Sequence, residues 1–370
     1  MSALKHFLFC FLDNTTSSVS QTSGVDVAVR YMKTVYLVMY CLIFIVGTLG
    51  NGLVIYVTGF RMKRTVNSVW FLNLALADFL FTVFLVFVIV SHSRGNQWDF
   101  GLFMCKLNTF VSVVNMFASV FLLTAISLDR CLSIWVVVWA HNRRTVFKAQ
   151  LACVVIWVAA GICSAPYASF RSISQRNGSP RCVYPAAVTH EQKWIIYTFR
   201  CVVGFVIPFL VILISYVAIA VRANRLQRTR RPKSRRIIYA VILAFFICWL
   251  PFHVISFIEL KISSNTELVN IVRIGGPLAG CLAFLNSCLN PILYVFMCDE
   301  FLKKLKQSIC LVLESALTED HLSFMSSRSL SSHFSRISRK SDSTAPTERK
   351  GTDASLTFTE CKQEDTLSTE

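Results

Sequence analysis

The chain has 370 residues, of which 54% are hydrophobic and only 15% are charged. Soluble domains carry about 25% charged residues, so this composition argues against an ordinary soluble globular protein. The 37 Lys and Arg residues outnumber the 20 Asp and Glu residues, and the formal net charge of +17 would suit a nucleic-acid binder. However, the basic residues lie between long apolar runs, where they would face lipid headgroups. Their placement excludes nucleic-acid binding as a first interpretation.

A helix needs about 20 apolar residues to cross the hydrocarbon core of a bilayer. Seven stretches of the chain reach or approach this length, near Thr34–Thr58, Val69–Ser91, Phe103–Ile134, Phe147–Ala165, Trp194–Val221, Ile237–Leu260 and Val269–Phe296. Some contain polar residues such as Asn51, Asp78 and Asn290, which a single lipid-exposed helix would not tolerate. The sequence therefore predicts an all-α membrane protein whose seven helices form a bundle.

The charges between these stretches predict the orientation of the chain. Basic residues gather in the first, third and fifth connections: Arg61, Lys63 and Arg64, then Arg143, Arg144 and Lys148, then the segment Arg222–Arg236, which has no acidic residue. The other connections contain acidic residues, namely Asp99, Glu191, Glu259 and Glu267. Because Lys and Arg are retained on the cytoplasmic side, we expect a plasma-membrane protein with its amino terminus outside and its carboxyl terminus inside.

Residues 1–33 are expected to form an extracellular arm, and residues 34–298 the bundle. Two glycosylation sequons, at Asn14 and Asn177, fall on the outer side in this orientation. Cys105 at the outer end of the third helix and Cys182 in the external fourth connection share the same oxidising compartment. We predict a disulfide between them that holds the fourth connection across the mouth of the bundle.

The pattern changes after the seventh stretch. Residues 299–313 combine apolar residues at helical spacing with three lysines, a pattern that is typical of an amphipathic helix on the inner leaflet. Cys310, near its end, is a candidate for palmitoylation, and an unmodified cysteine is the alternative. Residues 314–370 are rich in Ser and Thr and poor in large apolar residues, which predicts a disordered cytoplasmic tail.

Short motifs within the seven stretches carry a family resemblance. They are Gly50-Asn51, the run Asn73–Asp78, Asp129-Arg130-Cys131, Trp157, Pro208 with Tyr216, the run Cys248–Pro251, and the run Asn290–Tyr294. With these motifs in this order, the chain resembles the rhodopsin-like (class A) G-protein-coupled receptors from about residue 34 to 313. The sequences around Asp129-Arg130 and Asn290–Tyr294 are similar to those of the chemoattractant receptors. The sixth stretch looks most like a chemerin-receptor-like sequence.

Asp78 is an ionisable group at mid-membrane depth, where a charge is costly unless it is paired, protonated or bound to a cation. Oxygen-bearing side chains are expected near it: Ser119, Asn115, Asn286, Ser287 and Asn290. The resemblance implies that this set binds a sodium ion. The alternative is a structural polar cluster that joins the helices. We expect no other cofactor.

The resemblance also implies an activation switch. The Asp129–Arg130 pair would lock the inactive state, although an Arg there could also simply reach the headgroups. Prolines inside helices remove backbone hydrogen bonds and create kinks that act as hinges. The remaining residues expected in the switch are Tyr216, Trp249, Pro251, Asn290, Pro291 and Tyr294.

Arg200 is a cation in the outer third of the fifth helix, where it needs an anion. A carboxylate of a peptide C-terminus or of a fatty acid would bind it, whereas the alternatives are pairing with Glu259 or snorkelling outward. The outer half of helix three has no carboxylate for an amine ligand. Other residues expected near the ligand are Trp249, His253, Glu259, Asn108, Ser112, Arg171, Arg176 and Arg273. External arginines such as Arg176, Arg181 and Arg273 would steer an acidic partner or form only a solvated rim.

The predicted function is a receptor for a chemoattractant peptide or lipid, with a chemerin-like peptide favoured, that opens helix six to activate a heterotrimeric G protein. The resemblance implies coupling to the inhibitory class (Gi). Phosphorylation of the tail would create a negative patch suited to arrestin, and an unmodified tail is the alternative. A non-signalling scavenger receptor and a formyl-peptide or anaphylatoxin receptor are alternatives of the same fold. A transporter is remote because the chain shows no internal repeat. No catalytic constellation predicts an enzyme.

Overall fold

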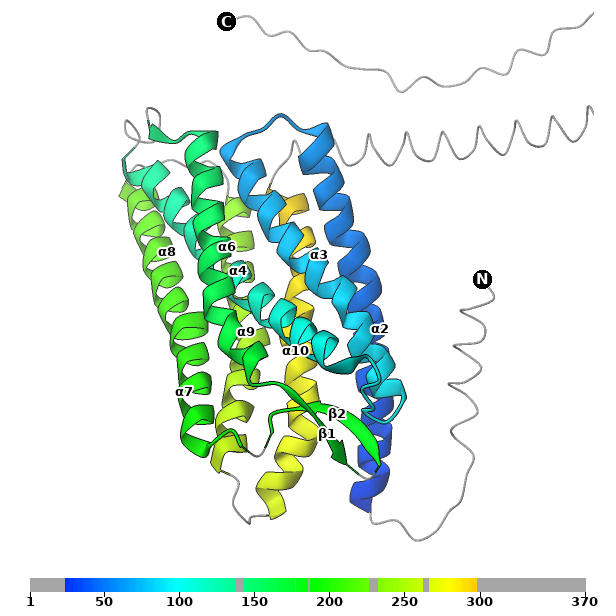
Figure 1. Ribbon diagram of the computed structural model, residues 1–370. Helices are drawn as coiled ribbons and strands as arrows, with labels where there is room; N and C mark the ends of the chain where they lie inside the picture. The colour runs from blue at the N-terminus through cyan, green and yellow to red at the C-terminus, as the bar shows by residue number, and fades with distance from the viewer. Residues whose placement is uncertain are drawn as a thin grey trace, which may run out of the picture. The chain divides into compact units, whose positions relative to one another are not determined.

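A computed structural model of the chain describes residues 24–136, 143–176, 178–185, 187–225, 232–261 and 266–297. Within these residues, seven helices are long and apolar enough to cross a membrane, and they pack as a bundle (Figure 1). The predicted all-α seven-helix architecture is therefore confirmed. Several predictions lie outside the described residues, namely those for Asn14, Asn177, the amphipathic helix 299–313 with Cys310, and the tail 314–370.

The seven crossings follow the chain in order. The first crossing is α2 (Gly24–Tyr56) with the π-helical turn η1 (Val57–Arg61), and the next three are α3 (Val66–Ser93), α4 (Gly101–Trp135) and α6 (Val146–Ser169). The fifth crossing consists of α7 (His190–Cys201), the π-helical turn η2 (Val202–Val206) and α8 (Ile207–Arg225). The last two are α9 (Pro232–Lys261) and α10 (Thr266–Met297). Each predicted stretch lies inside its helix. The largest difference is at α2, which begins at Gly24 and not at Thr34. Hydropathy detects only the part of a helix that matches the hydrocarbon layer, and α2 continues beyond that part.

Side chains in two of the connections cap the helices that follow. The hydroxyl of Thr65 accepts a hydrogen bond from the backbone of Ser68 at 3.1 Å, and Ser68 accepts one from the backbone of Thr65 at 2.8 Å. Thr189 and Gln192 form the same reciprocal pair at the start of α7. These bonds satisfy backbone N–H groups that have no partner inside the helix, so the positions of the capping residues define where the helices begin.

Proline shapes the fifth, sixth and seventh crossings. Pro208 is the second residue after η2, and Pro251 and Pro291 lie inside α9 and α10. Proline cannot donate the helical hydrogen bond and its ring crowds the preceding turn, so a wider π-helical turn before Pro208 relieves that conflict. Nothing in the hydropathy pattern indicates this turn.

The fourth connection contains a hairpin of β1 (Ser172–Arg176) and β2 (Ser179–Val183), which pair antiparallel. The hairpin lies at the same end of the bundle as the starts of α2 and α10 (Figure 1). Its second strand is joined to α4 by the Cys105–Cys182 disulfide, with 5.7 Å between the Cα atoms. The predicted disulfide is therefore confirmed, while the strands that carry it were not predicted.

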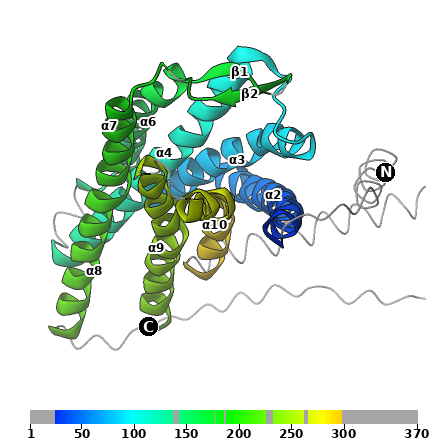
Figure 2. The ribbon, with the colours of Figure 1, turned by 90° about the horizontal axis from the view of Figure 1, so that it is seen from below.

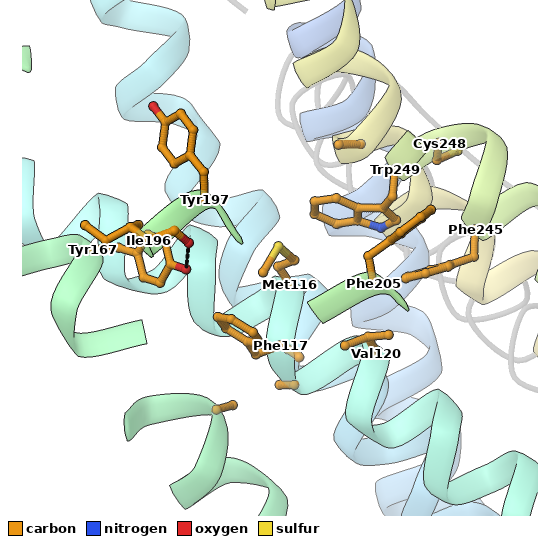
Figure 3. Close-up of a cluster of buried hydrophobic side chains, with 14 of the residues drawn as sticks. Met116, Phe117, Val120, Tyr167, Ile196, Tyr197, Phe205, Phe245, Cys248 and Trp249 are labelled. Atoms are coloured by element: carbon orange, nitrogen blue, oxygen red, sulfur yellow. Dashed lines mark hydrogen bonds between the residues drawn. The ribbon is translucent and has the colours of Figure 1, made fainter. Parts of the chain in front are cut away.

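The bundle is arranged around α4, which packs against α3, α6 and α8. Figure 2 looks along the bundle from the end that carries the hairpin and shows α2, α3 and α10 on one side and α6 and α7 on the other. Between them lies a cluster of buried apolar side chains from α4, α6, α7, η2 and α9, drawn in Figure 3: Met116, Phe117, Val120, Tyr167, Ile196, Tyr197, Phe205, Phe245, Cys248 and Trp249. The hydroxyl of Tyr167 donates to the carbonyl of Ile196 at 2.8 Å. This cluster forms the apolar core that packs α4, α6, α7 and α9 together.

Candidate ligand and signalling sites

Arg200 lies in the wall between α7 and α9 and is only 8% exposed. Its Nη2 donates a hydrogen bond to the hydroxyl of Ser256 at 2.7 Å. The centre of the guanidinium lies 4.5 Å from the ring of Phe252 and 4.9 Å from the ring of Tyr197. These cation–π contacts stabilise the cation, but both rings and the hydroxyl are neutral. The surroundings of the guanidinium therefore hold it in place without neutralising its charge.

Arg200 has no carboxylate partner among the described residues. Two ion pairs occur in the described ranges, and neither involves Arg200. Glu259, the alternative partner in the sequence, instead accepts a hydrogen bond from the hydroxyl of Tyr197 at 3.5 Å. The Nε of Arg200 is also buried without a hydrogen-bond partner in the described chain. Because a buried charge is costly unless it is paired, this site suits an anion from outside the chain.

Further buried polar atoms lie along the same region of the bundle. The Nε1 of Trp249 and both ring nitrogens of His253 have no hydrogen-bond partner within the described chain. On α4, the Oδ1 of Asn108 is in the same situation. The ring of His253 lies 4.9 Å from Phe205 and 6.3 Å from Trp249, which Figure 3 shows beside Phe205. An unmade hydrogen bond costs about 1–3 kcal/mol, so these atoms are positioned to bind a ligand or water.

Two other predicted ligand residues already have partners. The hydroxyl of Ser112 donates to the backbone carbonyl of Asn108 at 2.8 Å, so its proton is used inside α4. Arg171, just before β1, lies 4.1 Å from the ring of Tyr184. Its Nε is buried and has no hydrogen-bond partner among the described residues. Ser112 thus offers only its lone pairs to a ligand, whereas Arg171 keeps a free donor.

Arg176 and Arg273 are placed elsewhere. Both line a cavity of about 510 Å³ at the hairpin end of the bundle, and Arg200 is not part of its lining. The structure therefore divides the predicted ligand residues between the surroundings of Arg200 and this cavity at the hairpin end.

Asp78, on α3, is completely buried. Its Oδ2 accepts a hydrogen bond from Asn290 at 2.6 Å, and its Oδ1 accepts one from Ser119 at 3.3 Å. The side-chain amide of Asn115 donates to the hydroxyl of Ser287 at 3.0 Å. The structure thus brings together residues of α3, α4 and α10 that are far apart in the sequence.

Two asparagines complete the surroundings of this cluster. Asn286, also expected there, is buried on α10. Asn51 of α2, which the sequence predicts only as a bundle residue, donates to the backbone carbonyls of Ser287 at 3.0 Å and of Gly47 at 2.9 Å. The Oδ1 of Asn51 is buried without a partner in the described chain. The cluster therefore extends to a fourth helix and contains a spare oxygen acceptor.

At the cytoplasmic end, the carboxylate of Asp129 is bound by Arg144, from the connection before α6. The guanidinium makes a two-pronged contact, with Nε to Oδ1 at 2.9 Å and Nη2 to Oδ2 at 2.8 Å. Nη2 also donates to the side chain of Asn67 on α3 at 2.7 Å. The sequence predicts only Arg130 as the partner of Asp129, and Arg144 only as an orientation signal. A separation of 15 residues across a connection carries no signal that could have identified this contact.

The other predicted switch residues lie on three helices, α8, α9 and α10. The hydroxyl of Ser127 on α4 donates to that of Tyr216 on α8 at 3.4 Å. Helices α2 and α10 approach closely, because a Cβ added to Gly50 would lie 3.2 Å from the ring of Pro291. Tyr294 is in α10, but its side chain is outside the described part of the structure. Its predicted meeting with Tyr216 therefore stays a prediction.

Residues 50–294 match the family model described as 7 transmembrane receptor (rhodopsin family). The chain belongs to the rhodopsin family of seven-transmembrane receptors. Membership confirms the predicted class of protein, a signalling receptor and not an enzyme, and its predicted place as a multi-pass protein of the plasma membrane. It also sets aside the transporter alternative.

Individual relatives are similar over most of their length. Chemerin-like receptor 1 of Sus scrofa is 41% identical over 321 residues, which cover 81% of this chain and 87% of the relative. Chemerin-like receptor 1 of Homo sapiens is 41% identical over 310 residues, covering 79% and 82%. Prostaglandin D2 receptor 2 of Rattus norvegicus is 37% identical over 305 residues, covering 79% and 75%. The predicted likeness to the chemerin-receptor group is confirmed.

Proposed function

We propose that this receptor responds to an extracellular chemoattractant with a carboxylate, and that Arg200 binds that carboxylate. The observation that carries the proposal is the buried guanidinium with neutral neighbours and an unused Nε. A carboxylate placed there supplies the counter-charge and accepts charge-assisted hydrogen bonds, which are stronger than bonds between neutral groups. Trp249, His253 and Asn108 then contact the rest of the ligand through their unused polar atoms.

A peptide with a free C-terminus is the first candidate ligand, and an acidic lipid is the second. The names of the relatives include both a chemerin-like receptor and a prostaglandin D2 receptor, so both chemistries occur among similar chains. A chemerin-like peptide is favoured because chemerin-like receptor 1 of Sus scrofa shares 41% identity with this chain, against 37% for prostaglandin D2 receptor 2 of Rattus norvegicus. Formylated and anaphylatoxin peptides belong in the same screen.

The test compares Arg200→Gln with the unchanged receptor in cells, using peptides that differ only in a C-terminal acid or amide. A hydrogen bond to a charged group contributes about 1.5–3 kcal/mol, so the potency of the free acid should fall by about tenfold or more. The potency of the amide should change by less than about twofold. Arg94→Gln is the matched control, because the Arg94 side chain is 57% exposed and pairs with Asp99. Equal losses for acid and amide would refute the carboxylate anchor.

On the inner side, we propose that the receptor couples to a heterotrimeric G protein of the inhibitory class. We also propose that its phosphorylated tail binds arrestin. The contact of Arg144 with Asp129 and Asn67 ties together the cytoplasmic ends of α3 and α4 beside Arg130, which supports a G-protein contact in this region. Ligand-dependent inhibition of cyclic AMP production would support the coupling. Ligand uptake or arrestin recruitment without any G-protein response would favour the scavenger alternative.

We also propose a sodium ion at the Asp78 cluster. The cluster offers the carboxylate of Asp78 together with side-chain amide and hydroxyl oxygens. These are the oxygen ligands that hard cations prefer. The unpartnered Oδ1 of Asn51 is a further acceptor beside this set. A monovalent cation there offsets the charge of a carboxylate that is completely buried. Asp78, Ser119, Asn115 and Ser287 would hold it, and Asn290 would orient Asp78.

A further inference from the structure

The cavity at the hairpin end, of about 510 Å³, lies between α2, the end of α3, the hairpin and α10. Four of its lining residues are cations from four different elements: Lys33 of α2, Arg176 of β1, Arg181 of β2 and Arg273 of α10. No Asp or Glu is among the described residues that line it. Its volume is that of a small-molecule site, so four positive charges converge on a space that one ligand can fill.

The hairpin presents its two arginines together. Arg181 pairs with Ser174 across the strands, and Arg176 is two residues further along the same strand as Ser174. Because side chains alternate along a strand, Arg176 and Arg181 share one face of the hairpin. The position of that face is held by the disulfide at Cys182 and by the side chain of Gln97, which donates to Ser179 at 2.9 Å. The two guanidiniums are therefore positioned before any ligand arrives.

None of the four cations is neutralised by the described chain. The two ion pairs in the described ranges lie elsewhere, and the Nε of Arg181 is buried without a hydrogen-bond partner. Lys33, Arg176 and Arg273 are exposed, which leaves the cavity open to the extracellular solution. Like charges that line one cavity repel one another, and a multiply charged anion among them offsets that repulsion.

The floor of the cavity differs from its rim. The hydroxyl of Tyr36 donates to the backbone carbonyl of Ile274 at 2.5 Å, which joins α2 to α10 below the cations. Met32 and Pro277 add apolar surface to the lining. An apolar floor under a cationic rim suits a small amphiphilic molecule with a compact anionic head.

We propose that this cavity binds a phosphate monoester on a small apolar body, at a site separate from Arg200. At neutral pH a phosphate monoester carries between one and two negative charges and offers three acceptor oxygens. Guanidinium groups match such oxygens in pairs, and an ammonium adds a point charge. The apolar body rests on Tyr36 and Pro277. The inference does not depend on which ligand the central site takes.

The test uses the full chain in nanodiscs of zwitterionic phosphatidylcholine, at pH 7.5 and 0.15 M salt, so that diffuse charge effects are screened. The probes are 1-naphthyl phosphate, 1-naphthyl sulfate and 1-naphthoate, which differ only in the anionic head. The phosphate should bind most tightly by calorimetry, and Arg273→Gln and Lys33→Gln should each weaken it by about tenfold. Both residues are exposed, and thermal unfolding of each variant checks that it is folded.

Two control variants separate this site from other sources of binding. Arg94→Gln removes one exposed charge from the same end of the protein, and Arg200→Gln removes the central anchor; each should weaken the phosphate by less than about twofold. Losses with Arg94→Gln that match those with Arg273→Gln would mean diffuse attraction to a basic surface. Loss confined to Arg200→Gln would place the phosphate in the central site. Equal binding of the three probes, or no binding, would also overturn the proposal.

Discussion

Asp78 illustrates how a single buried carboxylate organises several helices. Its two oxygens accept hydrogen bonds from Asn290 on α10 and Ser119 on α4, so the side chain of α3 fixes the distance to both neighbours. Removing the charge while keeping the shape separates the structural role of this residue from a role in cation binding. Asp78→Asn is therefore an informative substitution.

In the unchanged receptor, replacing N-methylglucamine with sodium at constant ionic strength should lower agonist affinity by about fivefold or more, the scale of typical allosteric coupling. In Asp78→Asn the change should be less than about twofold, because the amide offers a cation no counter-charge. Radioligand competition measures both. Asp99→Asn, an exposed carboxylate at the outer end, should behave like the unchanged receptor. Full sodium sensitivity in Asp78→Asn would place the ion elsewhere.

In the sites around Asp78 and Arg200, the sequence identifies the charged residue but not its partners. Asp78 and Arg200 stand out because a charged residue inside an apolar stretch is costly and therefore noticeable. Their partners do not stand out. Ser256 is an ordinary helix residue until the fold places its hydroxyl 2.7 Å from Arg200, and Arg144 belongs to a basic connection that membrane charge alone explains. Partner choice depends on the packing of distant segments, which local patterns do not encode.

At the scale of elements, the apolar stretches predicted all seven crossings because the length of a helix is matched to the bilayer. The β1–β2 hairpin was not predicted, because Ser172–Arg176 has neither strong alternation nor β-branched enrichment, and its pairing is anchored by the disulfide at Cys182. The turn η2 was missed for a different reason. The wider turn relieves the steric clash that the ring of Pro208 would cause in a regular helix. A hydropathy profile carries no information about such a clash.

The contact of Arg144 with Asp129 and Asn67 links the connection before α6 to α3 and α4. In Arg144→Gln, the carboxylate of Asp129 loses this cation, and the cation next to it in the chain is Arg130. A stronger Asp129–Arg130 pair should hold Arg130 back from the G protein. We expect basal G-protein activation to fall by about two- to tenfold, which corresponds to roughly 0.4–1.4 kcal/mol. Nucleotide exchange on the G protein in membranes measures it.

A double-substitution cycle identifies the route of this effect. Asp129→Asn alone should raise basal activity, because no carboxylate remains to hold Arg130. If Arg144 acts through Asp129, adding Arg144→Gln to Asp129→Asn should change activity no further. The same fold decrease in both backgrounds would mean that Arg144 contacts the G protein directly.

At the scale of the whole molecule, the outside of the bundle exposes many large apolar side chains. On α6, the side chains of Val154, Val158 and Ile162 are 58%, 57% and 69% exposed. Soluble proteins rarely expose contiguous apolar surface of this kind, and a lipid environment removes the cost. Exposure at the middle of a helix therefore has a different consequence from exposure near its end, where a long side chain reaches the headgroups.

Two substitutions with similar exposure test this difference. Val158 lies near the middle of α6, whereas Ile195, which is 69% exposed, lies one turn into α7. A lysine at the bilayer centre costs roughly 2.5–3.5 kcal/mol, while a lysine near a helix end extends its ammonium to the headgroups at little cost. Val158→Lys should reduce the fraction of receptor at the cell surface several-fold, and Ile195→Lys should leave it near that of the unchanged chain, as measured by labelling an amino-terminal tag on intact cells. Equal tolerance of both lysines would contradict a lipid-facing position for Val158, because only depth in the bilayer distinguishes two side chains that are otherwise comparably exposed.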